Sequence, residues 1–154
     1  MLTVYLQVCF YTLSFGQVIS CCGDRCGSAV NQRCHMCGMD SAKSQTEFAV
    51  YADDGSMEYA CCLHCVYLLE KFMEPRKFIR IETRDFTTGA FIDAKKAYYL
   101  AAGSLIPKGS MAPFLLAFSE EDPAKQFQKK YKGSILTFKE AMKITAKFDE
   151  EEER

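Results

Sequence analysis

The stretch Phe48-Ala49-Val50-Tyr51-Ala52-Asp53-Asp54-Gly55-Ser56-Met57-Glu58-Tyr59-Ala60-Cys61 has the pattern of a β-hairpin that joins two clusters of cysteines. Its first four residues are strand-like, Asp53-Asp54-Gly55 is typical of a tight turn, and Ser56 to Cys61 can return as the partner strand. One cysteine cluster precedes the hairpin and the other begins at its last residue. A hairpin here would bring the two clusters together.

The residues after the hairpin predict a helix and a third strand. Apolar residues recur at helical spacing from Leu63 to Met73, and Pro75 stops the pattern. Phe78 to Thr83 alternates apolar with polar residues, as a half-buried strand does. The first half, about residues 34–85, is therefore predicted as strand, strand, helix and strand.

The second half, about residues 90–147, repeats that order. The expected strand, strand, helix and strand lie at Ala97–Leu100, Phe114–Phe118, Ser119–Gly133 and Ile135–Phe138, followed by a short helix from about Lys139. Pro123 and the acidic residues beside it are typical of a helix start, and a glycine is typical of a helix end. The shared pattern predicts an internal duplication within one domain, residues 34–147.

The first cysteine cluster, Cys34-His35-Met36-Cys37-Gly38-Met39, concentrates soft ligands in six residues. Its two thiols can reach one ion if the residues between them form a tight turn, and Gly38 supplies the necessary backbone freedom. Met39 is close enough to reach the same ion. Thiolate and thioether select Cu(I), zinc or iron–sulfur clusters, and zinc is normally held without methionine. Cu(I) is therefore the expected metal, and Zn²⁺ is the alternative.

The second cluster makes a structural zinc site a serious alternative. Cys62 and Cys65 repeat the Cys-x-x-Cys spacing, and Cys61 adds a neighbour. Together with Cys34 and Cys37 the pair could form a closed tetrahedral site of four thiolates, serving an interaction module. A redox pair that cycles through a disulfide is the third interpretation.

Three further residues are candidates for the site. Met111 follows Lys108-Gly109-Ser110 in a polar loop. Its side chain either faces solvent or a bound metal, or it packs into the core. His35 and His64 lie inside the two cysteine clusters. The sequence leaves three roles open for each histidine: a metal ligand, a neighbour that orients the ligands, or a structural hydrogen-bonding residue.

The N-terminal residues predict export. Residues 1–20 are apolar and uncharged, as in a signal peptide or a membrane anchor. Val18-Ile19-Ser20-Cys21 has the pattern of a bacterial lipobox, which predicts lipidation of Cys21, and residues 21–33 resemble a tether. The alternative is that Cys21 is an ordinary thiol. The expected location is the cell envelope, on the outer side of the cytoplasmic membrane.

Charge and residue types argue against two classes of function. The formal net charge is −1 and the basic residues are interspersed with acidic ones, unlike a nucleic-acid-binding surface. Neither Ser104 nor Ser110 has an identifiable base, so we expect no enzyme activity. Asp93 is expected to be a helix cap or turn residue. The acidic residues 148–154 are expected to form a solvated tail.

An ordered set of motifs resembles the NosL family, the copper-binding accessory lipoproteins of nitrous oxide reductase. The set comprises Cys34–Met39, Phe91-Ile92-Asp93-Ala94-Lys95-Lys96-Ala97-Tyr98-Tyr99, Gly103-Ser104, Gly109-Ser110-Met111, and the stretch from Ala117 to Phe138. The resemblance covers the chain from about Cys34 to Ala141.

The resemblance implies an α+β fold of two ββαβ halves, related to that of organomercurial lyase. It also implies a lipid-anchored protein that passes Cu(I) to a metalloenzyme such as nitrous oxide reductase, or to its maturation transporter. The family's ligands carry over to Cys37, Met39 and Met111, and to Cys34 where members have Cys-x-x-Cys. The cluster from Cys61 to Cys65 departs from the pattern, since many relatives have no thiol there, and it leaves the metal and the recipient open.

Overall fold

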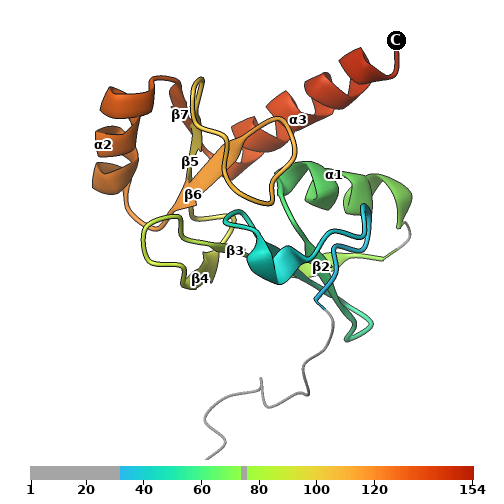
Figure 1. Cartoon of the computed structure of the whole chain (residues 1–154). Helices are drawn as coiled ribbons and strands as arrows, with labels where there is room; N and C mark the ends of the chain where they lie inside the picture. The colour runs from blue at the N-terminus through green and yellow to red at the C-terminus, as the bar shows by residue number, and fades with distance from the viewer. Residues whose placement is uncertain (1–31, 74–75) are drawn as a thin grey trace, which may run out of the picture. The chain divides into compact units, whose positions relative to one another are not determined.

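Two antiparallel sheets and three α-helices make up the part of the chain that the computed structural model describes, residues 32–73 and 76–154 (Figure 1). The predicted α+β class is confirmed. The predicted signal peptide or anchor, the lipidation site Cys21 and most of the tether lie outside the described residues. Within the described residues, no helix combines the length and the apolar character needed to cross a membrane.

The first half contains the four-stranded sheet. Its elements are β1 (Phe48–Ala52), β2 (Met57–Ala60), α1 (Leu63–Phe72), β3 (Phe78–Arg84) and β4 (Phe91–Asp93). The strand order is β2-β1-β3-β4, and each neighbouring pair is antiparallel. The predicted hairpin is present, with Phe48 opposite Ala60, and Gly55 adopts a φ of +81° in its turn.

The second half repeats the topology of the first. Its elements are β5 (Tyr98–Ala101), β6 (Leu115–Phe118), α2 (Glu121–Tyr131) and β7 (Ser134–Leu136), with strand order β6-β5-β7. In each half the first strand is central, the second and third strands flank it, and the helix connects the flanking strands. This shared topology agrees with the predicted fold of two ββαβ halves. Strand β4 and helix α3 (Phe138–Glu152) are additions to it.

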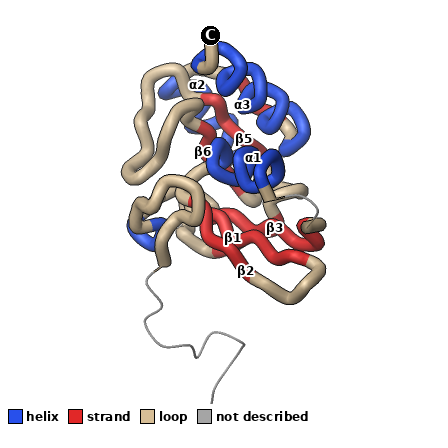
Figure 2. The backbone as a smooth tube through the Cα atoms, turned by 90° about the vertical axis from the view of Figure 1, so that its right-hand side faces the viewer, coloured by secondary structure: helices blue, strands red, loops and turns tan. Residues whose placement is uncertain are grey.

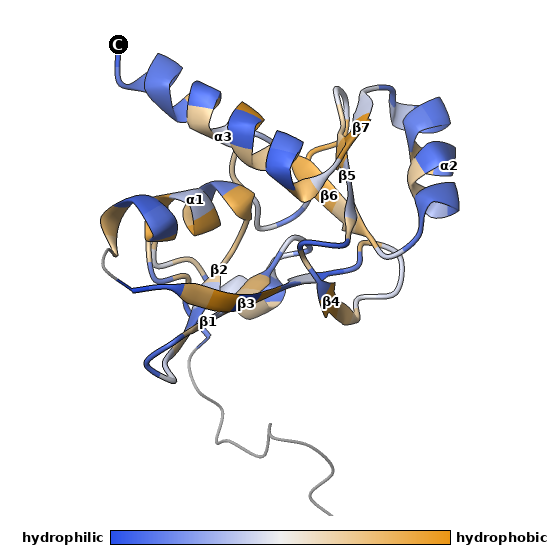
Figure 3. Cartoon of the chain, turned by 180° about the vertical axis from the view of Figure 1, so that it is seen from behind, coloured by the Kyte–Doolittle hydropathy of each residue, from blue (hydrophilic) through white to orange (hydrophobic). Residues whose placement is uncertain are grey.

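The two halves share one hydrophobic core. Alternate residues of a strand point to opposite faces of its sheet. Tyr99, Leu115 and Ala117 therefore join a core cluster with Phe48 and Ile81 of the first half. The opposite face of the second sheet packs on α2 through the smaller cluster of Leu100, Leu116, Phe118 and Ala124. Strand β6 is apolar, whereas α2 and the end of α3 are hydrophilic (Figure 3).

Asp85 connects the two halves through hydrogen bonds to backbone N–H groups. Its carboxylate accepts from Thr87 and Thr88 at 2.8 Å each and from Ser119, at the end of β6, at 2.7 Å. Burial acts to raise the pKa of Asp85, but these hydrogen bonds outweigh burial and hold the pKa far below the ordinary carboxyl value. The carboxylate thus fixes the second sheet against the loop that follows β3.

Two boundaries differ from the sequence prediction near the C-terminus. Thr137 caps α3 instead of ending a strand, because its hydroxyl accepts from the Glu140 N–H while the Glu140 carboxylate accepts from the Thr137 N–H. The predicted acidic tail at 148–154 is not separate, since α3 continues to Glu152 and buries Asp149. Figure 2 shows α1 over the first sheet, with α3 beside it.

Candidate metal centre

The first cysteine cluster forms the expected tight turn. The Gly38 N–H donates to the Cys34 carbonyl at 2.8 Å, and the Cys34 N–H donates to the Met39 carbonyl at 2.7 Å. Gly38 has a φ of +73°, which favours glycine because it has no Cβ. The turn leaves Cys34 buried and Cys37 exposed.

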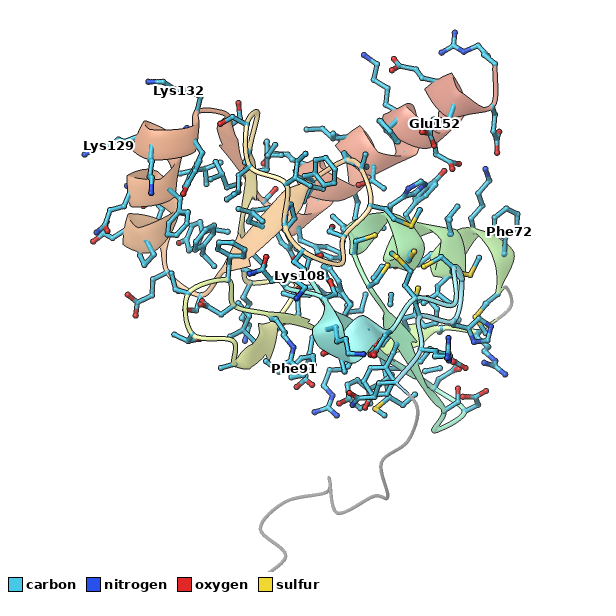
Figure 4. The ribbon with its side chains drawn as sticks, viewed as in Figure 1. Phe72, Phe91, Lys108, Lys129, Lys132 and Glu152 are labelled. Carbon is cyan, nitrogen blue, oxygen red and sulfur yellow. The ribbon has the colours of Figure 1, made fainter. Side chains whose placement is uncertain are left out.

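The hairpin brings the second cluster to this turn, as the sequence predicted. Cys61 directly follows β2, Cys62 is the N-cap of α1 and Cys65 lies in the first turn of that helix. The His35 N–H donates to the Tyr59 carbonyl at 2.9 Å, which ties the first cluster to the end of β2. Sulfur atoms gather beside α1 in Figure 4.

Four cysteine sulfurs form a preassembled cluster. The Sγ atoms of Cys34, Cys37, Cys61 and Cys65 all lie within 4.8 Å of one another. Cys61 is 3.5 Å from Cys37 and 3.6 Å from Cys65, measured between Sγ atoms. Metal–sulfur bonds of about 2.3 Å place the sulfurs of a tetrahedral or trigonal site about 3.8–4.0 Å apart. The four thiols can therefore close on one ion with small movements.

The membership of this group corrects the proposed set of four. The sequence paired Cys62 with Cys65 through their Cys-x-x-Cys spacing, but the structure places Cys61 in the group instead. Cys61 precedes the N-cap of α1, and its sulfur lies 3.6 Å from that of Cys65 in the first turn of the helix. Cys62 is the N-cap, and its sulfur lies 3.7 Å from that of Cys61. No local sequence pattern distinguishes Cys61 from Cys62 as the member of this group.

Hydrogen bonds among the thiols divide the cluster into proton donors and acceptors. Cys61 and Cys65 hydrogen-bond to Cys34, which lowers the pKa of Cys34, and to Cys62, which lowers the pKa of Cys62. The same bonds raise the pKa values of Cys61 and Cys65. A metal binds thiolate, so each thiol that binds an ion releases its proton.

Two buried hydroxyl groups that the sequence did not single out hold Cys61 in place. Ser44 and Thr46 donate from their side chains to the Cys61 carbonyl, at 2.6 and 2.9 Å. Both residues lie just before β1 and are buried. They fix the backbone at the point where the hairpin meets α1, and hence the position of the Cys61 sulfur.

The two histidines have different surroundings. His35 is half-exposed, and its Nδ1 lies 2.9 Å from a Glu58 carboxylate oxygen. His64 is buried, its Nδ1 donates to the Ala112 carbonyl at 3.0 Å, and its Nε2 lies 3.2 Å from an Asp149 carboxylate oxygen. Both ring nitrogens of His64 are thus occupied by oxygen partners. His64 links α1 to the Met111 loop and to α3.

Both predicted methionines lie at the core that contains the cysteines. Met39 and Met111 are half-buried and pack against the cluster that includes Cys34 and Cys61. The backbone of Met111 hydrogen-bonds to the Cys62 thiol. The polar loop is therefore beside the second cysteine cluster, although it is more than 40 residues away in sequence.

Residues 28–145 match the family model described as NosL. The chain belongs to the NosL family. This confirms the resemblance found in the motifs, and the family places the chain among non-enzymatic proteins, as predicted. No curated protein matches the chain at a significant level.

One solved NosL structure is similar in fold. It is described as the copper chaperone NosL from Shewanella denitrificans, with 20% sequence identity and a TM-score of 0.58. The match covers 77% of this chain and 96% of that one. At this identity the similarity establishes a shared fold, and the ligands must be argued from the residues of this chain.

Proposed function

We propose that this NosL-family protein is a Cu(I) carrier that delivers copper to a metalloenzyme. The observation that supports the proposal best is the group of four thiols within 4.8 Å of one another. Three of these thiols are buried, and Cys37 is exposed. The arrangement combines a protected soft pocket with one sulfur that a second protein can reach.

The donor set favours Cu(I) over harder ions. Thiolate and thioether are soft ligands, and no carboxylate or imidazole belongs to the group of four. Met39 and Met111 pack against the same core and add thioethers at its edge. The proposed ligands are Cys34, Cys37, Cys65, Met39 and Met111, which the sequence already indicated, together with Cys61.

Release of copper would begin at Cys37. A carrier hands over Cu(I) by ligand exchange, in which a recipient sulfur joins the ion before a donor sulfur leaves. Cys37 is the exposed member of the group, so its bond to copper is the one that an incoming ligand can replace. The recipient is proposed to be a metalloenzyme such as nitrous oxide reductase or its maturation transporter, since the family model that matches is NosL.

The proposed location is the outer side of the cytoplasmic membrane. The support is the apolar, uncharged segment 1–20 followed by the lipobox-like Val18-Ile19-Ser20-Cys21. Lipidation predicts that the expressed protein partitions into detergent and that Cys21→Ala abolishes the partitioning. If Cys21→Ala partitions as before, an anchor helix replaces lipidation as the explanation.

Competition with a chromophoric Cu(I) chelator, on reduced protein without oxygen, tests the carrier function. Met39→Ala and Met111→Ala should each weaken Cu(I) binding about tenfold or more, equivalent to at least ~1.4 kcal/mol. Met57→Ala is the matched control, because Met57 is an exposed residue of β2. If the folded, reduced protein does not bind Cu(I) at micromolar concentration, the proposal is refuted.

A structural zinc site is the second candidate, favoured by the closed character of the cluster. Four thiols, three of them buried, match the donor set of structural zinc centres. The zinc ligands would be Cys34, Cys37, Cys61 and Cys65. Cys61 replaces Cys62 of the set predicted from the sequence. Elemental analysis of anaerobically purified protein, produced with both metals available, separates the candidates. Stoichiometric zinc that Cu(I) does not displace would support this reading and contradict the carrier function.

A further inference from the structure

A fifth thiol adjoins the four-thiol group and is not needed by a single ion. Cys62 is buried, with 2% of its surface exposed. Its sulfur lies 3.7 Å from that of Cys61, close to the sulfur–sulfur separation within one metal site. Its sulfur hydrogen-bonds to backbone groups of Cys65 and Met111 as well as to neighbouring thiols. Cys62 is thus part of the sulfur cluster, although it occupies the N-cap position of α1.

The thiols are arranged with two members in the middle and others at two ends. Cys61 and Cys65 hydrogen-bond to Cys34 and also to Cys62. The Cys61 sulfur lies 3.6 Å from that of Cys65. Cys37 adjoins Cys61 as well, at 3.5 Å between sulfurs. The two middle thiols are thus within reach of partners on both sides.

Each end of the cluster also has a methionine beside it. Met39 follows the first turn, and its carbonyl accepts from the Cys34 N–H at 2.7 Å. Met111 belongs to a distant loop, and its backbone hydrogen-bonds to the Cys62 thiol. The first end therefore has Cys34, Cys37 and Met39, and the second has Cys62 and Met111.

We propose that the pocket holds two Cu(I) ions that share Cys61 and Cys65 as bridging thiolates. Cys34 or Cys37 completes the coordination of one ion, and Cys62 completes that of the other. This inference rests on the proposed Cu(I) function and extends it from one ion to two. Two trigonal ions need six metal–sulfur bonds, and two bridging thiolates with one terminal thiolate each supply all six.

Binding of two Cu(I) ions requires no change in oxidation state. Each thiol that binds an ion as thiolate releases its proton to solvent.

The test counts Cu(I) ions on the reduced, full-length chain in the absence of oxygen. Chelator competition and native mass spectrometry should give two Cu(I) per monomer, and X-ray absorption should show copper–copper scattering. Cys62→Ser should bind one Cu(I) and lose that scattering. Serine is a favourable N-cap residue, so this variant should keep helix α1 and remain folded.

The outcomes separate this inference from the carrier function. One Cu(I) in both the original protein and Cys62→Ser would overturn the two-ion inference and leave the carrier function standing. Two Cu(I) in both proteins would also overturn the assigned role of Cys62. Two ions found only in dimers would show that a second chain supplies the ligands and would refute a site within one chain. No binding of Cu(I) at all would refute the carrier function itself.

Discussion

Replacing Asp149 with alanine should destabilise the protein, although Asp149 lies in the most acidic segment of the chain. Its carboxylate lies 3.2 Å from Nε2 of His64 and accepts from Nζ of Lys71 at 2.8 Å. The side chains of Asp149 and His64 are only 11% and 6% exposed. The variant therefore removes the oxygen partner of a buried imidazole nitrogen.

The size of the effect follows from the burial of each partner. An unsatisfied buried polar atom costs about 1–3 kcal/mol, and His64 cannot easily turn its ring toward water because the Ala112 carbonyl binds the other nitrogen. Lys71 is one-third exposed and can return to water, so its ion pair adds little. We expect Asp149→Ala to lower the free energy of unfolding by about 1–3 kcal/mol.

Urea unfolding of the reduced, metal-free protein at neutral pH measures this change. Glu150→Ala is the matched control, because Glu150 is the next residue of α3 and is exposed. An exposed substitution of this kind changes stability by no more than about 0.5 kcal/mol. If Asp149→Ala and Glu150→Ala are equally stable, the docking of α3 on α1 through His64 is refuted.

Acid should weaken the contact of the Asp149 carboxylate with His64 and Lys71. The hydrogen bond from Lys71, opposed by burial and assisted by His64, lowers the pKa of Asp149 in the folded protein. A lowered folded pKa means that the carboxylate stabilises the fold above the ordinary carboxyl pKa of about 4 and ceases to do so as the pH falls through the folded value. The stability difference between the original protein and Asp149→Ala should therefore shrink below about pH 4.

Three further substitutions test other parts of the fold. Gly133→Ala should lower the free energy of unfolding by more than about 1 kcal/mol, because its φ is +103° and a Cβ would lie 1.9 Å from a backbone oxygen of β5. Gly103→Ala is the control and should leave stability unchanged, because no heavy atom lies within 4 Å of the added Cβ. Tyr99→Phe should cost about 1 kcal/mol, since its buried hydroxyl donates to the Ala94 carbonyl at 2.8 Å. Asp85→Asn should reduce stability at neutral pH and remove part of the acid dependence, because its pKa is lowered in the folded state. Urea unfolding across pH checks all three, and unchanged midpoints would contradict them.

Local patterns predicted the elements that surround the metal centre. The turn residues between Phe48 and Cys61 encoded the hairpin, and the spacing of Cys34, Gly38 and Cys37 encoded the tight turn. Both are determined by residues a few positions apart, so the chain carries the information within each segment. The repeated pattern of strands and helix was likewise enough to predict the duplicated ββαβ topology.

Contacts between distant segments decided what the sequence could not. The sequence could not choose between Cys61 and Cys62, because the choice depends on how the end of β2 meets the first turn of α1. The short β4 was missed because Phe91-Ile92-Asp93 shows no alternation of apolar and polar residues, and the strand is defined by its pairing with β3.

The sequence by itself determined the kind of ligand, the turn, the hairpin and the fold class, because each depends on residue type and short-range spacing. Only the tertiary structure decided which sulfurs meet, that the Met111 loop adjoins Cys62, and that Asp149 is buried against His64. The physical reason is that these contacts join residues up to 85 positions apart. Their formation depends on packing the two halves and α3 around one core.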